Sequence, residues 1–172
     1  IYAAGDCVES VNLVTGNPML TQLGTIAVRQ AKVAGINAAG GKSEFVGTLG
    51  SWITRLFDTE IGGTGLPAFM AEKYGVKSVS ASITSKTRAE YFPGALPIRI
   101  KLVADKQTRK LISAQIIGGE EVTQRINALS FAIQNGMTAD KLAKAETCYA
   151  PPVSETWEPM VLAAELLLRK LK

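Results

Sequence analysis

Hydrophobic residues recur at helical spacing along two stretches of the chain, residues 23–39 and 120–135. In the second stretch Ile126, Leu129 and Ile133 fall on one helical face, which is typical of an amphipathic helix packed on a core. Further helices are expected over residues 66–73, 139–145 and 159–171, the second of them capped by Thr138.

Other stretches follow the two-residue spacing of β-strands. Residues 76–91 alternate apolar with small or polar side chains, as a half-buried strand does. Residues 97–103 and 110–117 predict two more strands, which a short turn joins into a hairpin, and residues 45–61 are expected to be extended. Strands followed by segregated helices predict an α+β fold with an antiparallel sheet and helices on one face.

The N-terminal part has a different organisation. Ile1–Ala4 is expected to form a short apolar strand, and a polar loop over residues 9–18 separates it from the helix over residues 23–39. Glycines after this helix predict a boundary, so we assign residues 1–43 to a strand–helix remnant of an α/β domain and residues 44–172 to the α+β domain. Because the chain opens at Ile1 on an expected strand, we expect it to be cut from a longer protein.

The composition excludes several kinds of site. The chain has no histidine, so histidine-dependent hydrolytic triads and HExxH-type zinc sites are ruled out, and no metal site is expected. Hydrophobic residues make up 47% and the net charge is only +4, which favours a globular protein that binds neither nucleic acid nor membrane. The two cysteines, Cys7 and Cys148, form no disulfide framework, which indicates a reducing, cytoplasmic setting.

The first candidate site lies at the N-terminus. A strand that ends in small residues and Gly5 lets a ligand approach the backbone closely, and Asp6 then offers oxygens to ligand hydroxyls. The helix that begins near Leu23 and Gly24 presents free amides and the positive end of its dipole. A plain turn that happens to contain an aspartate is the alternative interpretation.

The second candidate site consists of two tyrosines. Tyr149 stands at the start of a Tyr-Ala-Pro-Pro turn that its prolines make rigid, and Tyr91 also comes just ahead of a turn. A phenol both donates and accepts hydrogen bonds. The alternative is that these are ordinary surface or interface tyrosines. We expect the neighbouring Cys148 to be a packed small residue and not a redox thiol.

Residues 63–68 match the GxGxxA pattern of a dinucleotide-binding turn. They neither follow a strongly apolar strand nor open a long helix, both of which that turn requires. We therefore interpret the segment as a glycine-rich turn in which Thr64 caps a short helix.

The residues as a set resemble one family. Residues 1–7 resemble the second flavin-binding motif of the FAD-dependent pyridine nucleotide-disulfide oxidoreductases, residues 23–40 resemble the helix that follows it, and the chain from Phe45 onward resembles their C-terminal dimerisation domain. The missing histidine and the Tyr-Ala-Pro-Pro loop are similar to the branch that contains NADH oxidases and CoA-disulfide reductases.

This resemblance implies a homodimeric enzyme with FAD as cofactor and NAD(P)H as substrate, of which this fragment alone is inactive. It assigns Asp6 to the ribityl hydroxyls of FAD, the backbone near Cys7 to the adjoining phosphate region, and the amides near Leu23 and Gly24 to the pyrimidine side of the flavin. Gly24 replaces the alanine usual in the motif, a change that a backbone contact tolerates. The electron acceptor stays open between oxygen, a CoA disulfide and a polysulfide.

The resemblance assigns the tyrosines a catalytic role. Tyr91 and Tyr149 match positions from which two tyrosines reach the active-site cysteine of the other subunit. We expect the dimer to form through an apolar face that includes Trp52, Phe57, Ile133 and Leu166. The alternative is a self-contained, non-enzymatic α+β dimer that binds an acyl or CoA-like ligand through its basic residues Arg99, Lys101 and Lys106.

Overall fold

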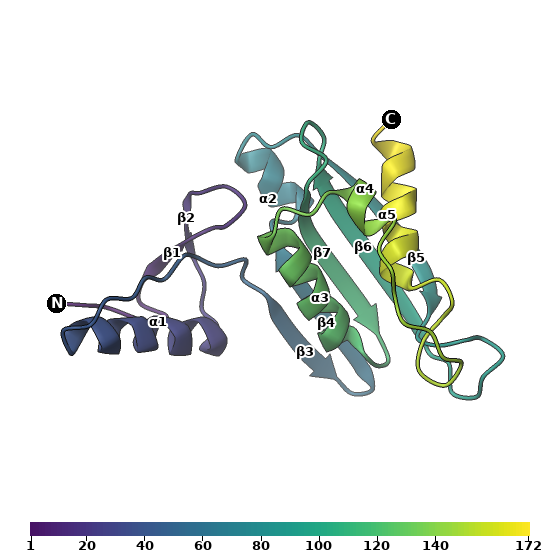
Figure 1. Cartoon of the computed structure of the whole chain (residues 1–172), viewed down its shortest axis with the longest axis horizontal. Helices are drawn as coiled ribbons and strands as arrows, with labels where there is room; N and C mark the ends of the chain where they lie inside the picture. Colours follow the sequence, from purple (N-terminus) through teal and green to yellow (C-terminus); the bar gives the residue numbers. More distant parts are fainter. The chain divides into compact units, whose positions relative to one another are not determined.

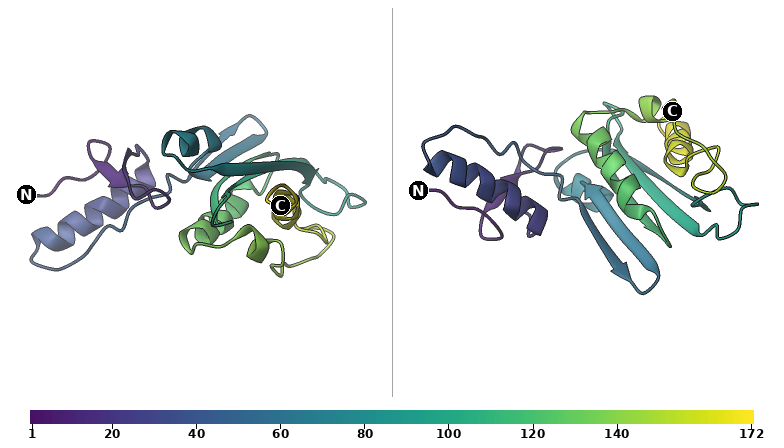
Figure 2. Two further views of the ribbon diagram at one scale, coloured as in Figure 1. Left: turned by 90° about the horizontal axis from the view of Figure 1, so that it is seen from above. Right: turned by 60° about the horizontal axis from the view of Figure 1, so that its bottom comes forward.

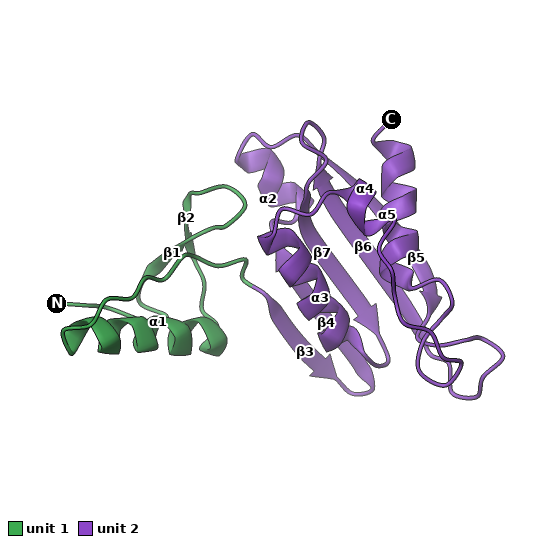
Figure 3. Cartoon of the chain, in the orientation of Figure 1, with its two compact units in different colours: residues 1–50 green, residues 51–172 purple.

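The computed structural model describes residues 1–172, which divide into two compact units, residues 1–50 and residues 51–172 (Figure 3). The division between domains after Ser43 stays a prediction.

The first unit contains a small hairpin and one helix. Strand β1 (Glu9–Val11) pairs antiparallel with β2 (Pro18–Leu20), and helix α1 spans Gly24–Ala38. The helix is confirmed almost to the residue. The polar loop expected over residues 9–18 was wrong in part, because each strand is only three residues long and too short to show a clear alternation.

The N-terminal strand expected over Ile1–Ala4 is absent. These residues form no ladder with any other strand, and Ile1 and Tyr2 are exposed. A strand needs a neighbour to satisfy its backbone N–H and C=O groups, and the sheet of the first unit contains only β1 and β2. The apolar sequence alone therefore did not suffice to make this segment a strand.

The second unit is built on one antiparallel sheet of five strands in the order β3-β4-β7-β6-β5 (Figure 1). The strands are β3 (Trp52–Leu56), β4 (Thr59–Gly65), β5 (Ser78–Lys86), β6 (Pro97–Asp105) and β7 (Leu111–Gly118). Strand β5 lies within the predicted long strand, and β6 and β7 form the predicted hairpin. The predicted α+β class with an antiparallel sheet is confirmed.

Helices cover one face of this sheet. Helix α3 (Val122–Gln134) packs on β4 and β7, and α5 (Pro159–Lys170) packs on β5 and β6 (Figure 2). Two short helices complete the unit, α2 (Ala68–Lys73) beside β5 and α4 (Ala139–Leu142) beside α5. The Thr138 side chain accepts a hydrogen bond from the Lys141 amide, which confirms the predicted cap of α4.

The core lies between the sheet and these helices. Alternate residues of β6, namely Ile98, Ile100 and Leu102, are buried, whereas Arg99 is exposed and Lys101 partly exposed. Ile133, which we expected at the dimer face, is buried in the domain instead, because α3 directs it toward the sheet. That expectation was wrong for Ile133.

The GxGxxA segment has a structural role, as predicted, but it is part of a strand and not a turn that caps a helix. Gly63, Thr64 and Gly65 belong to β4, and the residue before α2 is Pro67, so Thr64 is not a helix cap. Gly65 has a φ of +78°, and a Cβ there would lie 2.1 Å from the Ile112 carbonyl oxygen. Glycine is therefore required for the close approach of β4 and β7.

None of the helices has the length and the apolar sequence needed to cross a membrane.

Candidate functional site

The structure brings Tyr91 and Tyr149 together. Tyr91 lies in the loop of residues 87–96 between β5 and β6, and Tyr149 lies in the loop of residues 143–158 between α4 and α5. Their hydroxyl oxygens are 2.7 Å apart, which is a hydrogen bond. The side chains remain 75% and 46% exposed, so the pair is open to a partner or a ligand.

Thr87 closes the loop that carries Tyr91. Its amide donates to the Leu96 carbonyl at 2.9 Å, and its hydroxyl accepts from the Leu96 amide at 3.1 Å. The same hydroxyl donates to Glu120 at 2.8 Å, and Arg88 also bonds this carboxylate. The two ends of the loop are thus joined to each other and to the start of α3, and Tyr91 lies at the exposed tip.

Ser154 holds the backbone on both sides of Tyr149. Its hydroxyl accepts a hydrogen bond from the Ala150 amide at 3.0 Å and donates one to the Cys148 carbonyl at 3.1 Å. These bonds bend the chain around Tyr149. Cys148 itself is exposed, so the expectation that it would be packed was wrong.

The hydrogen bond within the pair favours the neutral phenol. Tyr149 raises the pKa of Tyr91 above its ordinary value, chiefly through this bond. Either hydroxyl can be the donor in this bond. Whichever hydroxyl accepts keeps its own hydrogen free to donate to a third atom, and an O–H group that accepts a hydrogen bond is also a better donor.

This arrangement predicts the effect of Tyr149→Phe on Tyr91 in the chain itself. Removal of the Tyr149 hydroxyl should bring the Tyr91 pKa back toward its ordinary value of about 10. Carbon NMR signals of isotope-labelled tyrosine rings, followed against pH, resolve the four tyrosines. Tyr74→Phe is the control and should leave the Tyr91 titration as it is. An unchanged Tyr91 titration in Tyr149→Phe would show that the hydroxyls do not interact.

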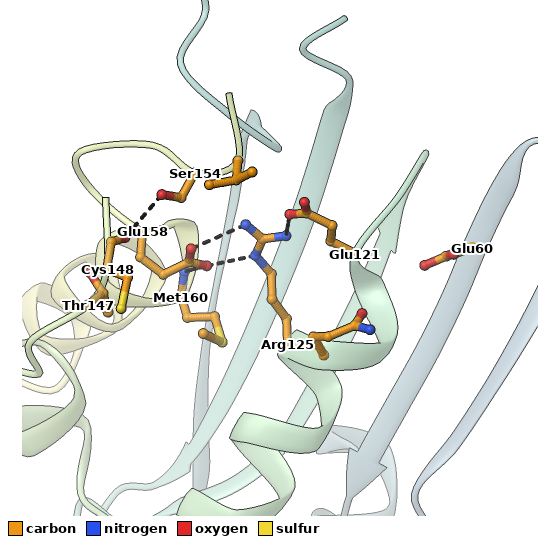
Figure 4. A pocket seen from close by; sticks show the side chains of 10 residues that line it. Glu60, Glu121, Arg125, Thr147, Cys148, Ser154, Glu158 and Met160 are labelled. Atoms are coloured by element: carbon orange, nitrogen blue, oxygen red, sulfur yellow. Dashed lines mark hydrogen bonds and ion pairs between the residues drawn. The ribbon is translucent and has the colours of Figure 1, made fainter. Parts of the chain in front are cut away.

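A buried ion-pair cluster lies at the base of the two loops, beside an open pocket of about 700 Å³ (Figure 4). The Arg125 guanidinium donates to both carboxylate oxygens of Glu158, at 2.7 and 3.2 Å, and to Glu121 at 3.0 Å. The Arg125 and Glu158 side chains are only 7% and 9% exposed. Burial acts to lower the pKa of Arg125, but the hydrogen bonds to the two carboxylates outweigh it and keep the charge.

Arg125 was not predicted from the sequence, although a signal was present. It lies between Val122 and Leu129 on the apolar face of α3, three residues after the first and four before the second. A charged residue at a buried helix position requires a partner of opposite charge. Glu158, just before the proline that begins α5, is that partner.

The N-terminal candidate residues lie in the first unit. Gln30 of α1, which is buried, accepts a hydrogen bond from the Gly5 amide at 2.8 Å and donates one to Ser10 at 2.7 Å, and so fixes the turn that carries Asp6 and Cys7. Gly5 has a φ of +96°, a conformation that favours glycine. Asp6 and Cys7 are exposed, so their polar groups are open to a ligand. A signal for Gln30 was present in the sequence, since this polar residue lies four positions after Ile26 on the same face of the helix.

Leu23 and Gly24 stand where expected, at the start of α1. No side chain caps this helix, and its first turn contains no acidic residue. The first amides of the helix are therefore available to an external acceptor. No cluster of three or more histidine, cysteine or acidic side chains is placed to hold a metal ion.

Comparison with known proteins identifies the family. Residues 53–161 match the pyridine nucleotide-disulphide oxidoreductase, dimerisation domain. An NADH oxidase of Methanocaldococcus jannaschii is 47% identical over 99% of this chain, and a coenzyme A disulfide reductase of Staphylococcus aureus is 33% identical over 90% of it. The chain spans only 38% and 35% of the lengths of these relatives.

Solved structures of similar proteins support the same family assignment. An NAD-dependent persulfide reductase from A. fulgidus superimposes with a TM-score of 0.94 at 39% identity, covering 99% of this chain and 32% of that one. A water-forming NADH oxidase from Lactobacillus brevis gives a TM-score of 0.94 at 28% identity, with 99% and 38% covered. The α+β unit is thus a dimerisation domain of the oxidoreductase type. The chain belongs to the pyridine nucleotide-disulphide oxidoreductases.

Proposed function

We propose that this chain is the dimerisation domain, preceded by the end of the FAD-binding domain, of an FAD-dependent NAD(P)H oxidoreductase, and that Tyr91 and Tyr149 complete the active site of the partner subunit in a homodimer. The observation that carries the proposal is the meeting of the two hydroxyls, 2.7 Å apart on an exposed surface, although 58 positions separate the residues in sequence. Family membership and the NADH oxidase and disulfide reductase relatives support it.

The surroundings of the pair suit a protein partner. The loop of Tyr149 also exposes Val153 and Trp157, at 59% and 62%. Aromatic side chains are enriched at protein interfaces. Exposed aromatic and apolar residues next to a hydrogen-bonding pair would let a second subunit exclude water from the hydroxyls.

In such a site the tyrosines would act as hydrogen-bond donors. When a disulfide or persulfide bond breaks, negative charge develops on the leaving sulfur. A donor already placed at that position stabilises the charge, and exclusion of water strengthens the effect. The hydroxyl that accepts within the pair keeps its hydrogen free, and that hydrogen is the group that we expect to fill this role.

The first unit would hold one part of the cofactor. FAD, when bound, carries electrons from the nicotinamide to the acceptor. The exposed Asp6 carboxylate suits the ribityl hydroxyls, the backbone near Cys7 suits the phosphate region, and the amides at Leu23 and Gly24 suit the flavin ring. A helix N-terminus there favours negative charge on the bound group. A cytoplasmic location belongs to the same proposal and rests on the two scattered cysteines.

The test is an assay of the full-length protein with NADH and NADPH against oxygen, CoA disulfide and polysulfide. We expect bound FAD, oxidation of a reduced nicotinamide, and a clear preference for one acceptor. The isolated 172-residue chain, assayed in parallel, should be inactive. A full-length protein that binds no flavin, or a chain that is active alone, would refute the proposal.

A further inference from the structure

The tyrosine pair needs support from the base of its loops. The hydrogen bond between Tyr91 and Tyr149 joins two exposed side chains, which water can compete for. The residues come from separate loops, one after β5 and the other before α5. Something buried must therefore fix the position of one loop relative to the other if the hydroxyls are to meet reliably.

Arg125 contacts an end of each loop. Two of its nitrogens bond the carboxylate of Glu158, the last residue of the loop that carries Tyr149 and the N-cap of α5 (Figure 4). One of these nitrogens also donates a long hydrogen bond of 3.4 Å to the Thr87 carbonyl. Thr87 is the first residue of the loop that carries Tyr91. Thr87 is fully buried, so both attachments lie below the surface on which the tyrosines stand.

The hydrogen bond from Arg125 to Thr87 affects both ends of the Tyr91 loop, because Thr87 joins them. Thr87 bonds the Leu96 backbone at the far end of the same loop, as described above. Glu120 binds both Thr87 and Arg88, and these bonds lower the Glu120 pKa below its ordinary value although burial acts to raise it. A shift of the Arg125 guanidinium would consequently move Thr87, and with it both ends of the Tyr91 loop.

We propose that Arg125 is a positioning residue, which holds the two tyrosine-bearing loops in the register that lets the Tyr91 and Tyr149 hydroxyls meet. Its effect on turnover rests on the proposed function, since the register matters to catalysis only where the hydroxyls take part. The planar guanidinium suits the task because it presents several donors at fixed angles, so it can bond a carboxylate twice and a carbonyl once. Lysine carries the same charge without that fork.

The first test uses the 172-residue chain and does not depend on activity. In Arg125→Lys we expect the Tyr91 pKa, followed by NMR of labelled tyrosine rings, to move toward the value measured in Tyr149→Phe. Arg109→Lys is the matched control. Two nitrogens of Arg109 bond the Asp140 carboxylate, and neither residue belongs to the loops that carry the tyrosines. A Tyr91 titration that is unchanged in folded Arg125→Lys overturns the proposal.

If Arg125→Lys fails to fold, Glu158→Gln makes the same test. It keeps the size of the side chain and an acceptor for the Met160 amide, while it removes the charge that binds Arg125. We expect a shift of the Tyr91 pKa in the same direction. An unchanged Tyr91 titration in this variant also counts against the positioning role.

The second test uses the full-length flavoenzyme. We expect Arg125→Lys to slow electron transfer to the acceptor by up to roughly a hundredfold, as misplacement of reacting groups can do, without slowing reduction by NADH. In a Tyr91→Phe, Tyr149→Phe background the same change should have almost no further effect. Equal slowing in both backgrounds contradicts positioning through the tyrosines. If the double Phe variant keeps full rates while Arg125→Lys still shifts the Tyr91 pKa, the proposed function fails and the positioning role stands.

Discussion

Tyr149→Phe in the full-length enzyme should slow reduction of a disulfide acceptor by roughly a hundred- to a thousandfold, the usual cost of removing one donor from a water-excluded site that stabilises developing charge. The exchange keeps the ring and its packing, so it isolates the hydroxyl whose oxygen lies 2.7 Å from that of Tyr91. Reduction of the enzyme by NADH should proceed at its normal rate. Rapid mixing separates these two half-reactions.

Tyr91→Phe should slow the same half-reaction. Either hydroxyl can be the one that keeps a free hydrogen, and the other supports it through their mutual bond. Tyr74→Phe serves as the control, because Tyr74 lies at the end of α2, outside both loops. If neither Phe variant changes the rate with any acceptor tested, the tyrosines are packing residues only.

Arg125→Ala should lower the free energy of unfolding by about 3–5 kcal/mol, the typical loss when one partner of a buried ion pair is removed. The reason is that the Glu158 carboxylate, only 9% exposed, would keep its charge without a partner. Urea unfolding of the 172-residue chain measures this as a lower midpoint at an unchanged slope.

Arg109→Ala provides the comparison. Arg109 bonds Asp140 with two contacts of 2.7 Å, as short as the best contact in the buried pair. The side chains are 38% and 44% exposed, so water replaces the lost partner and the stability should hardly change. Similar losses in the two variants would mean that burial does not determine the strength of these pairs.

The elements with long, regular patterns were predictable from the sequence. Helices α1, α3 and α5 and strands β6 and β7 appear close to their expected bounds, because each is long enough to repeat its spacing several times. Strand β5 was predicted too long, since it ends at Lys86 and not at Tyr91. Strands β1 and β2 were missed, since each is three residues long. Ile1–Ala4 was overpredicted because strand pairing depends on a neighbour, which an apolar sequence does not reveal.

The candidate site was predictable only in part. Spacing alone could not bring together Tyr91 and Tyr149, and resemblance to the family singled them out. Arg125 and Glu158 were missed, although a charged residue on the apolar face of α3 was a usable sign. Gln30, which holds the turn before Asp6, gave a similar sign, because it lies four residues after Ile26 on the buried face of α1.

The central claim, that the tyrosine pair of one subunit serves the active site of the other, is tested most directly by mixing two inactive variants of the full-length enzyme. One subunit carries Tyr91→Phe and Tyr149→Phe, and the other carries serine in place of the active-site cysteine that the family resemblance implies. In a mixed dimer with two-fold symmetry, tyrosines that act across the interface meet an intact cysteine in one of the two sites. Equal mixing should therefore restore about a quarter of the wild-type activity. No recovery, with mixed dimers shown to form, would contradict the claim.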